Sequence, residues 1–251
     1  MATPQVPSAH RAVALLRELA RHPAPVPAVT LARALDLPRS TTYHLLTALM
    51  DEGFVTHLPE ERRWALGVAA FELGTAYLRQ GRLERLARPL LVALAASQRL
   101  TAHLGVLDGR DVLYLVKEHP SGVPPVITEV GVRLPAHLTA SGRALLAGLD
   151  PAQLAALYPA RTPLTRRTAT GPADPLALRQ VLRQTAARGW ADEDGEVEQG
   201  YQSVAVAARD HAGRVAAAVT LTGRSDRFGV PQTVATAVSA VAAQLSDRLQ
   251  R

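Results

Sequence analysis

The sequence of 251 residues contains no cysteine. This absence excludes disulfide bonds, thiol catalysis and thiolate metal sites, and it fits a reducing compartment. Long apolar runs are missing too, because none reaches the roughly 18 residues that a membrane span needs. The N-terminus also lacks the basic-then-apolar order of a secretory signal. We therefore expect a soluble, cytoplasmic protein with no membrane partner.

Lysine is nearly absent, since Lys117 is the one lysine among 28 basic residues. The net charge of +6 would suit a protein that binds nucleic acid. However, residues 1–67 hold seven arginines and six acidic residues, so the N-terminal region is almost neutral. The total charge is therefore weak evidence for DNA binding, which has to be judged from the placement of individual residues.

The length favours two domains, and the first has the pattern of a DNA-binding fold. Apolar periodicity predicts helices over residues 9–21, 28–35 and 39–51. Asp36 stands at the turn between the last two, where its short side chain tolerates a left-handed backbone. Helix, short turn and helix form the helix-turn-helix arrangement. Two predicted strands follow at 54–58 and 62–66, as in the wing of a winged helix.

The third predicted helix has two distinct faces. Pro38 fits a first helical position, and Gly53 fits a left-handed cap after the last turn. The face expected to be buried carries Thr41, Thr42, Leu45, Leu46, Leu49 and Met50. The opposite face carries hydrogen-bond formers with little net charge: Arg39, Ser40, Tyr43, His44 and Thr47. Such a face suits contact with base edges and phosphates, although an ordinary polar helix surface is the alternative.

Arg62 and Arg63 lie where the predicted wing turns back. They are placed for contact with phosphates or the minor groove. From spacing alone, a solvated arginine pair at a hairpin tip is an equally good interpretation.

Beyond residue 67 the pattern changes twice. Residues 68–97 predict two helices, separated near Gly81, of which the first connects the domains and offers a dimer surface. Strands are then predicted at 102–107, 112–116 and 126–130, and helices at 141–149, 151–158 and 176–188. A strand from Trp190, an acidic turn at 192–194, a hairpin of strands 203–208 and 215–221, and a helix at 230–249 complete the chain. The order predicts an α+β fold with helices packed on an antiparallel sheet.

Three segments resemble the IclR family of bacterial transcriptional regulators. Residues 35–46, LDLPRSTTYHLL, and 49–55, LMDEGFV, are similar to its helix-turn-helix signature. Residues 132–147, VRLPAHLTASGRALLA, resemble its loop and helix of small residues, and residues 188–200, RGWADEDGEVEQG, resemble its last signature. Two features depart from the family pattern: His44 stands where arginine is frequent, and the wing turn lacks the usual glycine.

The resemblance implies a winged helix-turn-helix domain at 1–67, a linker helix at 68–81 and a GAF-like effector-binding and oligomerisation domain at 82–251. It implies a homodimer or a dimer of dimers on a palindromic operator in double-stranded DNA. The expected DNA-binding residues are Arg39, Ser40, Thr41, Tyr43, His44, Thr47, Arg62 and Arg63. The expected effector-binding residues are Leu134, Leu138, Ala140, Ser141, Gly142, Glu193, Asp194, Ser203, Thr220 and Thr222.

The chemistry of the expected effector residues suits a small organic acid or an oxygenated aromatic molecule. A helix that begins near Ala140 would offer free N–H groups to a carboxylate, and hydroxyls would come from Ser203, Thr220 and Thr222. The alternating threonines are also ordinary strand residues, and the acidic run at 192–194 alone would be a solvated turn. No cofactor and no metal site are expected.

An enzyme is the alternative function. The sequence has no phosphate-binding loop, dinucleotide fingerprint, nucleophile elbow or zinc-protease motif. A hydrolase that uses Ser141 or Ser203 with a histidine has no other support. A sensor that acts through protein partners alone is disfavoured by the complete helix-turn-helix. We therefore predict an effector-responsive, DNA-binding transcriptional regulator, either a repressor or an activator, and not an enzyme.

Overall fold

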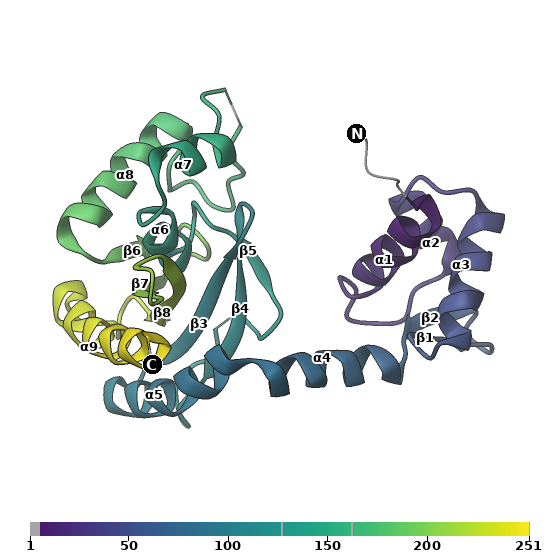
Figure 1. Ribbon diagram of the computed structural model, residues 1–251, viewed down its shortest axis with the longest axis horizontal. Coiled ribbons are helices and arrows are strands. Elements are labelled where there is room, and N and C mark those ends of the chain that lie inside the picture. Colours follow the sequence, from purple (N-terminus) through teal and green to yellow (C-terminus); the bar gives the residue numbers. More distant parts are fainter. Residues whose placement is uncertain (1–5, 127, 162, 251) are drawn as a thin grey trace. The chain divides into compact units, whose positions relative to one another are not determined.

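The computed structural model describes residues 6–126, 128–161 and 163–250, without the side chains of residues 75–80. The chain divides into two compact units, residues 1–81 and 82–251, and each is described by itself (Figure 1). No helix among the described residues is long and apolar enough to cross a membrane.

The first unit is a small helical domain with a two-stranded ribbon. Its elements are α1 (Pro7–Leu19), α2 (Ala28–Ala34), α3 (Arg39–Asp51), β1 (Val55–Leu58), β2 (Arg63–Leu66) and α4 (Val68–Gln80). Leu15, Leu31 and Leu46, one from each of the first three helices, are fully buried together. Trp64 of β2 closes this core and exchanges two backbone hydrogen bonds with Val26, at 2.9 and 2.8 Å. The predicted helix-turn-helix and its ribbon are therefore present.

The turn before α3 and the turn after it have the predicted backbone. Asp36 has φ 50° and Gly53 has φ 72°, both left-handed. Two details of the prediction were wrong. Pro38 is the N-cap with an extended ψ of 142°, and the helix begins one residue later. Met50 is 38 % exposed, because α3 turns its last apolar residue away from the small core.

The second unit is a six-stranded antiparallel sheet with helices on both sides (Figure 1). The strand order is β5-β4-β3-β8-β7-β6. The strands are β3 (Thr101–Asp108), β4 (Asp111–Glu118), β5 (Arg133–Pro135), β6 (Ala191–Asp194), β7 (Tyr201–Arg209) and β8 (Val215–Arg224). The helices are α5 (Arg82–Gln98), α6 (Ala140–Leu146), α7 (Pro151–Leu157), α8 (Pro175–Arg188) and α9 (Pro231–Gln250). The α+β class and the antiparallel sheet are confirmed.

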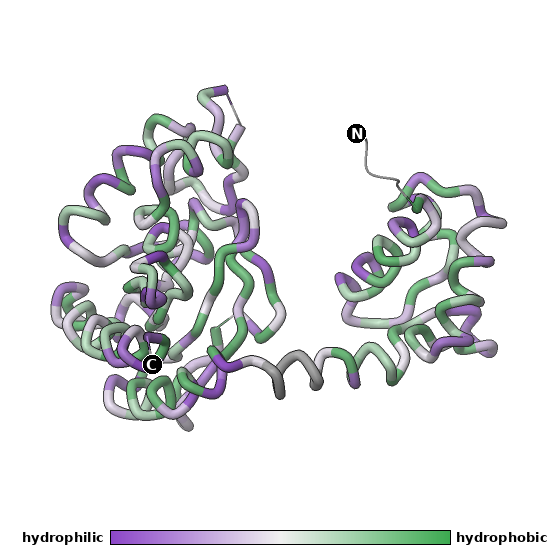
Figure 2. The backbone as a smooth tube through the Cα atoms, in the orientation of Figure 1, coloured by the Kyte–Doolittle hydropathy of each residue, from purple (hydrophilic) through white to green (hydrophobic). Residues whose placement is uncertain are grey.

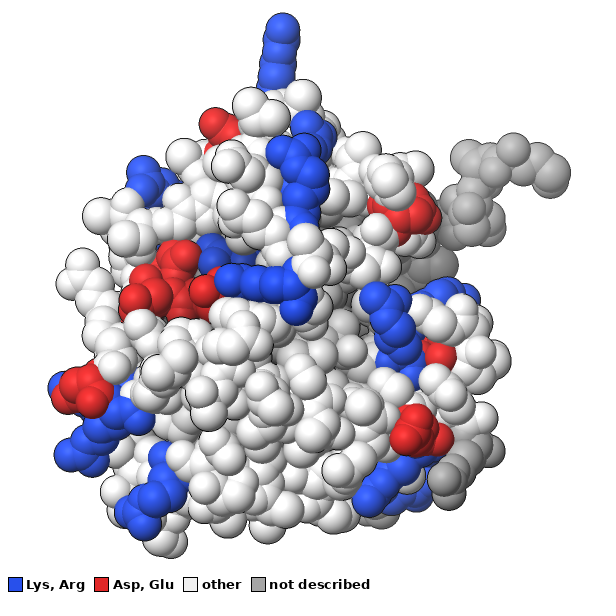
Figure 3. Space-filling model, turned by 90° about the vertical axis from the view of Figure 1, so that its left-hand side faces the viewer, with Lys and Arg blue, Asp and Glu red and all other residues white. Residues whose placement is uncertain are grey.

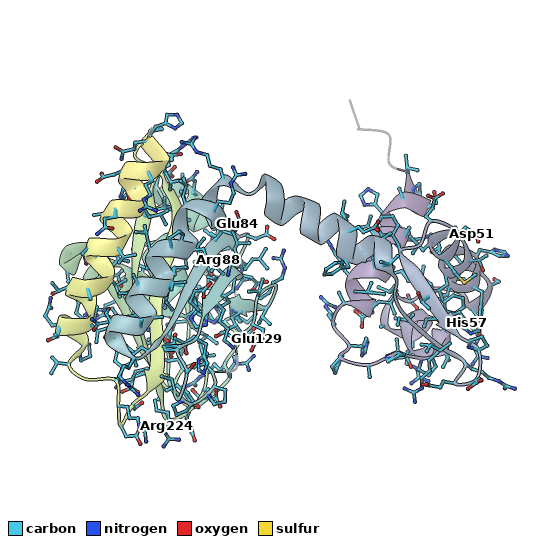
Figure 4. All side chains as sticks on the ribbon, turned by 90° about the horizontal axis from the view of Figure 1, so that it is seen from below. Asp51, His57, Glu84, Arg88, Glu129 and Arg224 are labelled. Atoms are coloured by element: carbon cyan, nitrogen blue, oxygen red, sulfur yellow. The ribbon has the colours of Figure 1, made fainter. Side chains whose placement is uncertain are left out.

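Two apolar layers hold the sheet between its helices. On one face α5 and α9 pack on β3, β4, β7 and β8, and on the other face α6 packs on β7 and β8 and is backed by α8. Figure 2 shows mostly apolar colours along the central strands. At the edge of α5, Glu84 and Arg88 lie one turn apart (Figure 4), and Arg88 pairs with Glu118 of β4 at 2.6 Å.

Two elements of the second unit differ from the prediction. The strand predicted at 126–130 was wrong: Val126 and residues 128–130 are not in a strand, and Ile127 lies outside the described residues. Backbone hydrogen bonds to Tyr114 of β4 begin at Gly131 and Val132, and β5 follows at Arg133. The acidic run at 192–194 is not a turn but strand β6, which pairs with β7.

Candidate functional sites

The polar face of α3 lies open on the first unit. Arg39, Ser40, Tyr43, His44 and Thr47 are all exposed, and Thr41 is half-buried. Within the described part of the chain none of the five exposed side chains takes part in a hydrogen bond or ion pair, whereas their neighbours Thr42 and Leu46 are buried. Residues three, four and seven apart share one side of a helix. The arrangement therefore presents an unpaired hydrogen-bonding surface on a short, firmly packed helix.

The two arginines of the ribbon have different roles. Arg62 has φ 53° at the turn, so it takes the left-handed conformation that the missing glycine would take. Arg63 donates to the carbonyl of Pro25 at 2.8 Å and thus ties the ribbon to the α1–α2 connection. The side chain of Arg62 is exposed, whereas one guanidinium nitrogen of Arg63 is bonded to a carbonyl group of the same unit.

A cavity of about 390 Å³, partly open to solvent, lies beside α6 in the second unit. It is bounded by β4, β5, β6, β7, β8 and the loops after β4 and β6. Its described lining residues are Tyr114, Val126, Thr128, Leu134, Thr139, Ala140, Ser141, Glu193, Val197, Glu198, Tyr201, Ser203 and Thr222. Ligand sites are typically concave and combine apolar walls with a few convergent polar groups, as this lining does.

Hydroxyl groups form a layer at the cavity wall, in two hydrogen-bonded groups. Ser141 shares hydrogen bonds with Thr220 at 2.7 Å and with Tyr114 at 3.3 Å. Ser203 shares one with Thr222 at 3.0 Å, because the two residues are paired across β7 and β8. Hydroxyls can both donate and accept, so this layer can turn toward different ligand groups without leaving a buried atom unpaired.

Glu193 is the buried carboxyl group of the cavity wall. Its Oε1 accepts from the Ser203 hydroxyl at 2.8 Å, and its Oε2 accepts from the backbone N–H of Glu196 at 3.2 Å. Burial raises the pKa of Glu193 to about 8, the Ser203 hydrogen bond opposes this, and the negative charge of Glu196 adds to it. Glu193 is therefore mainly protonated at neutral pH.

The raised pKa makes stability depend on pH in a definite direction. Between the ordinary carboxyl pKa of 4.5 and about 8, the folded state binds more protons at Glu193 than the unfolded state. The free energy of unfolding contributed by this group therefore falls as the pH rises through that window. We expect Glu193→Gln, which stays neutral, to flatten the fall between pH 5.5 and 8.5 in urea titrations. Equal pH profiles for the variant and the wild type would contradict the assignment.

Arg143 of α6 holds the segment that follows β6. Its Nε donates to the carbonyl of His137 at 3.0 Å, and one terminal nitrogen donates to the carbonyl of Asp192 at 2.8 Å. The other donates to Glu196 Oε1 at 2.9 Å. The Arg143 side chain is 4 % exposed. This arginine clamp fixes the backbone next to Glu193, which belongs to the cavity wall.

The predicted effector residues divide into two groups. The structure brings six of them to the cavity: Leu134, Ala140, Ser141, Glu193, Ser203 and Thr222. Four do not line it: Leu138, Gly142, Asp194 and Thr220. Thr220 lies beneath, bonded to Ser141. Asp194 lies on the opposite face of β6 from Glu193 and accepts from Gln202 at 2.7 Å, because side chains alternate along a strand.

Gly142 and Thr139 determine the backbone geometry at the start of α6. A Cβ on Gly142 would lie 2.1 Å from the Ala136 carbonyl oxygen, so the close approach requires glycine. The Thr139 hydroxyl accepts from the Gly142 N–H at 2.9 Å. This N–H, which we expected to be free for a ligand, is therefore already capped.

Sequence reasoning missed several lining residues, chiefly Tyr114, Thr128, Thr139, Glu198 and Tyr201. Tyr114 could have been found, since it lies on the predicted strand 112–116 at an alternating position. Thr128 and Tyr201 come from segments whose place depends on the complete sheet. No local sequence pattern indicated that these two residues would line the cavity.

Neither Ser141 nor Ser203 is hydrogen-bonded to a histidine among the described residues. Within the described residues Ser141 is bonded to Thr220 and Tyr114, and Ser203 to Glu193 and Thr222. His103 is bonded to Thr128 at 2.6 Å, and burial lowers its pKa to about 3. No group of three His, Asp or Glu residues that could hold a metal ion occurs in the described part of the chain.

Two family models match the chain. "IclR helix-turn-helix domain" covers residues 8–59, and "Bacterial transcriptional regulator IclR C-terminal" covers residues 75–247. The Glycerol operon regulatory protein of Streptomyces griseus is 34 % identical over 97 % of this chain and 96 % of its own. The HTH-type transcriptional regulator XynR of Escherichia coli is 33 % identical over 89 % of each chain. An IclR homolog from Microbacterium hydrocarbonoxydans, crystallised with 4-hydroxybenzoate, shares the fold with a TM-score of 0.83 at 24 % identity, over 97 % of this chain and 99 % of that one.

Proposed function

The chain belongs to the IclR family of bacterial transcriptional regulators, and from that membership we propose that α3 reads an operator while the cavity beside α6 receives the effector. The protein is a transcriptional regulator with a DNA-binding helix-turn-helix domain and an effector-binding domain. Its relatives are regulators, and no contact among the described residues favours the hydrolase alternative. We infer that it is not an enzyme and that it acts in the cytoplasm, where its DNA is.

The observation that carries the DNA-reading proposal is the open face of α3. Its five exposed polar side chains are unpaired, so contacts with DNA would not cost them existing bonds. A recognition helix places such residues in the major groove. Arg39 and Ser40 stand at its first turn and suit phosphates, while His44 and Thr47 suit base edges. The exposed Arg62 at the ribbon tip adds a wing contact, with Arg63 beside it.

Replacing Arg39 by alanine should weaken binding to the operator and lower the slope of its salt dependence by about one for each half-site, because a phosphate contact is lost. The operator is sought by footprinting the DNA that flanks the protein's own gene. Arg11→Ala on α1 removes the same charge from the same unit and is the matched control. Undiminished operator binding by the Arg39 variant would refute the assignment of α3.

A second copy of the chain is the proposed protein partner. Two-fold symmetric regulators place two recognition helices on a palindromic site. Apolar side chains stand exposed on α4, with Val68 68 % and Leu73 63 % exposed. Surfaces of this kind mark interfaces. We therefore propose a dimer, or a dimer of dimers, in which the effector changes the spacing of the reading helices.

Family membership leaves the chemical class of the effector open. One relative is named for a glycerol operon, and glycerol is an uncharged triol. Another was crystallised with 4-hydroxybenzoate, an aromatic carboxylate. The choice between an uncharged and an anionic ligand for this chain rests on its own cavity residues.

A further inference from the structure

The described lining of the cavity contains no positively charged residue. Its polar members are two carboxyl groups, from Glu193 and Glu198, and a larger set of hydroxyls. The hydroxyls belong to Tyr114, Thr128, Thr139, Ser141, Tyr201, Ser203 and Thr222. A carboxylate entering this space would meet no lysine or arginine among the described lining residues. Burial of an unpaired charge is strongly unfavourable.

Two cations that contact the segments around the cavity are committed to other partners. Arg143 gives its Nε and both terminal nitrogens to His137, Asp192 and Glu196. Lys117 pairs with Glu129 and also donates to the carbonyl of Val126. Neither can turn toward the cavity without breaking these bonds. The capped N–H of Gly142 at the start of α6 removes one further donor that an anion could have used.

The carboxyl group of Glu193 also disfavours a cationic ligand. Both of its oxygens already accept hydrogen bonds, from Ser203 and from the Glu196 N–H. Burial keeps it mainly protonated, with a pKa of about 8. An amine would need the ionised form, whereas a ligand hydroxyl can accept the carboxyl proton and donate to the neighbouring hydroxyls.

We propose that the effector of this protein is an uncharged, polyhydroxylated molecule, a small polyol or monosaccharide, held by the hydroxyl layer and Glu193. This inference rests on the proposed function of the cavity and narrows it to one ligand class. Ser141, Ser203 and Thr222 line the cavity, and each shares a hydrogen bond with another hydroxyl, Ser141 with Thr220 and Ser203 with Thr222. Ligand hydroxyls can both donate to these groups and accept from them.

The test compares matched probes on the full-length protein by calorimetry and thermal shift. The neutral probes are glycerol, ribitol and ribose; the acidic ones are glycerate and ribonate; the cationic one is 1-amino-1-deoxyribitol. We expect at least one neutral probe to bind at least about tenfold more tightly than its acid. Burying the unpaired charge of the acid costs binding free energy, and each 1.4 kcal/mol of that cost lowers the affinity tenfold. Tighter binding of an acid or of the amine, or no binding of any neutral probe, overturns the inference.

Substitutions of lining residues test whether the probe binds in the cavity. Ser203→Ala combined with Thr222→Val should weaken the neutral probe about fivefold to a hundredfold, since two hydrogen bonds are lost. Ser97→Ala removes a hydroxyl of α5 outside the cavity and serves as the control. Wild-type affinity for the neutral probe should fall above about pH 8 as Glu193 ionises, and Glu193→Gln should abolish this fall. Affinity for the neutral probe that stays level or rises through this pH range would overturn the inference.

Measurements of operator binding distinguish a failure of this inference from a failure of the proposed function on which it rests. If an acid binds in the cavity and changes operator binding, the regulator remains and the polyol inference fails. If the wild-type protein leaves no footprint on DNA, the proposed function fails whatever the probes do.

Discussion

Replacing Arg143 by methionine lowers the free energy of unfolding of the second unit by about 3–5 kcal/mol, the cost of removing one partner from a buried ion pair. Methionine keeps much of the length of the side chain but leaves Glu196 and two carbonyl groups without their donor. The Glu196 side chain is only 13 % exposed, so water does not easily replace the arginine. The measurement is urea unfolding followed by the emission of Trp190, in a Trp64→Phe background.

Arg133→Met is the matched control for the Arg143 variant. Arg133 pairs with Asp108 at the surface, where the two side chains are 47 % and 58 % exposed. Exposed pairs contribute about 0–1 kcal/mol. Similar losses for both variants would show that the clamp on the segment after β6 does not hold the unit together.

Replacing Leu46 by alanine destabilises the first unit by about 2–5 kcal/mol, because it leaves a cavity in a small core. Leu46 is fully buried against Leu15 and Leu31, and it fixes the side of α3 that faces inward. Operator affinity should fall with the stability, since the reading face is set by the same packing. The emission of Trp64 in a Trp190→Phe background reports the unfolding.

Met50 provides the comparison for Leu46. It lies one turn further along α3 and is 38 % exposed, so Met50→Ala should cost well under half as much. If the two variants lose stability equally, the inward face of α3 has been assigned incorrectly.

Local signals predicted the first unit closely. The bounds 39–51 of α3 were predicted without error, because apolar spacing, a preceding proline and a following glycine agree there. The left-handed Asp36 and Gly53 also follow from residue type alone. Two details failed: Pro38 is the N-cap and not the first helical residue, and Met50 is exposed, since burial of the last turn depends on how many neighbours the domain supplies.

The second unit was predicted well in its order but less well in its details. Strand β6 was misread as a turn because an acidic sequence has low strand propensity, and its pairing with β7 decides its state. The cavity needs residues from strands that are neighbours only in the finished sheet. Ser203 and Thr222 were expected from the resemblance to the family, whereas Thr128 and Tyr201 were not.

Arg62 shows how selection for stability and selection for affinity diverge at one position. An arginine at φ 53° bears a backbone cost of about 1 kcal/mol that glycine would avoid. A library screened for heat resistance alone should therefore enrich glycine or asparagine at this site. A library screened for promoter occupancy should retain arginine, so the preferred residue reports which property an experiment has selected.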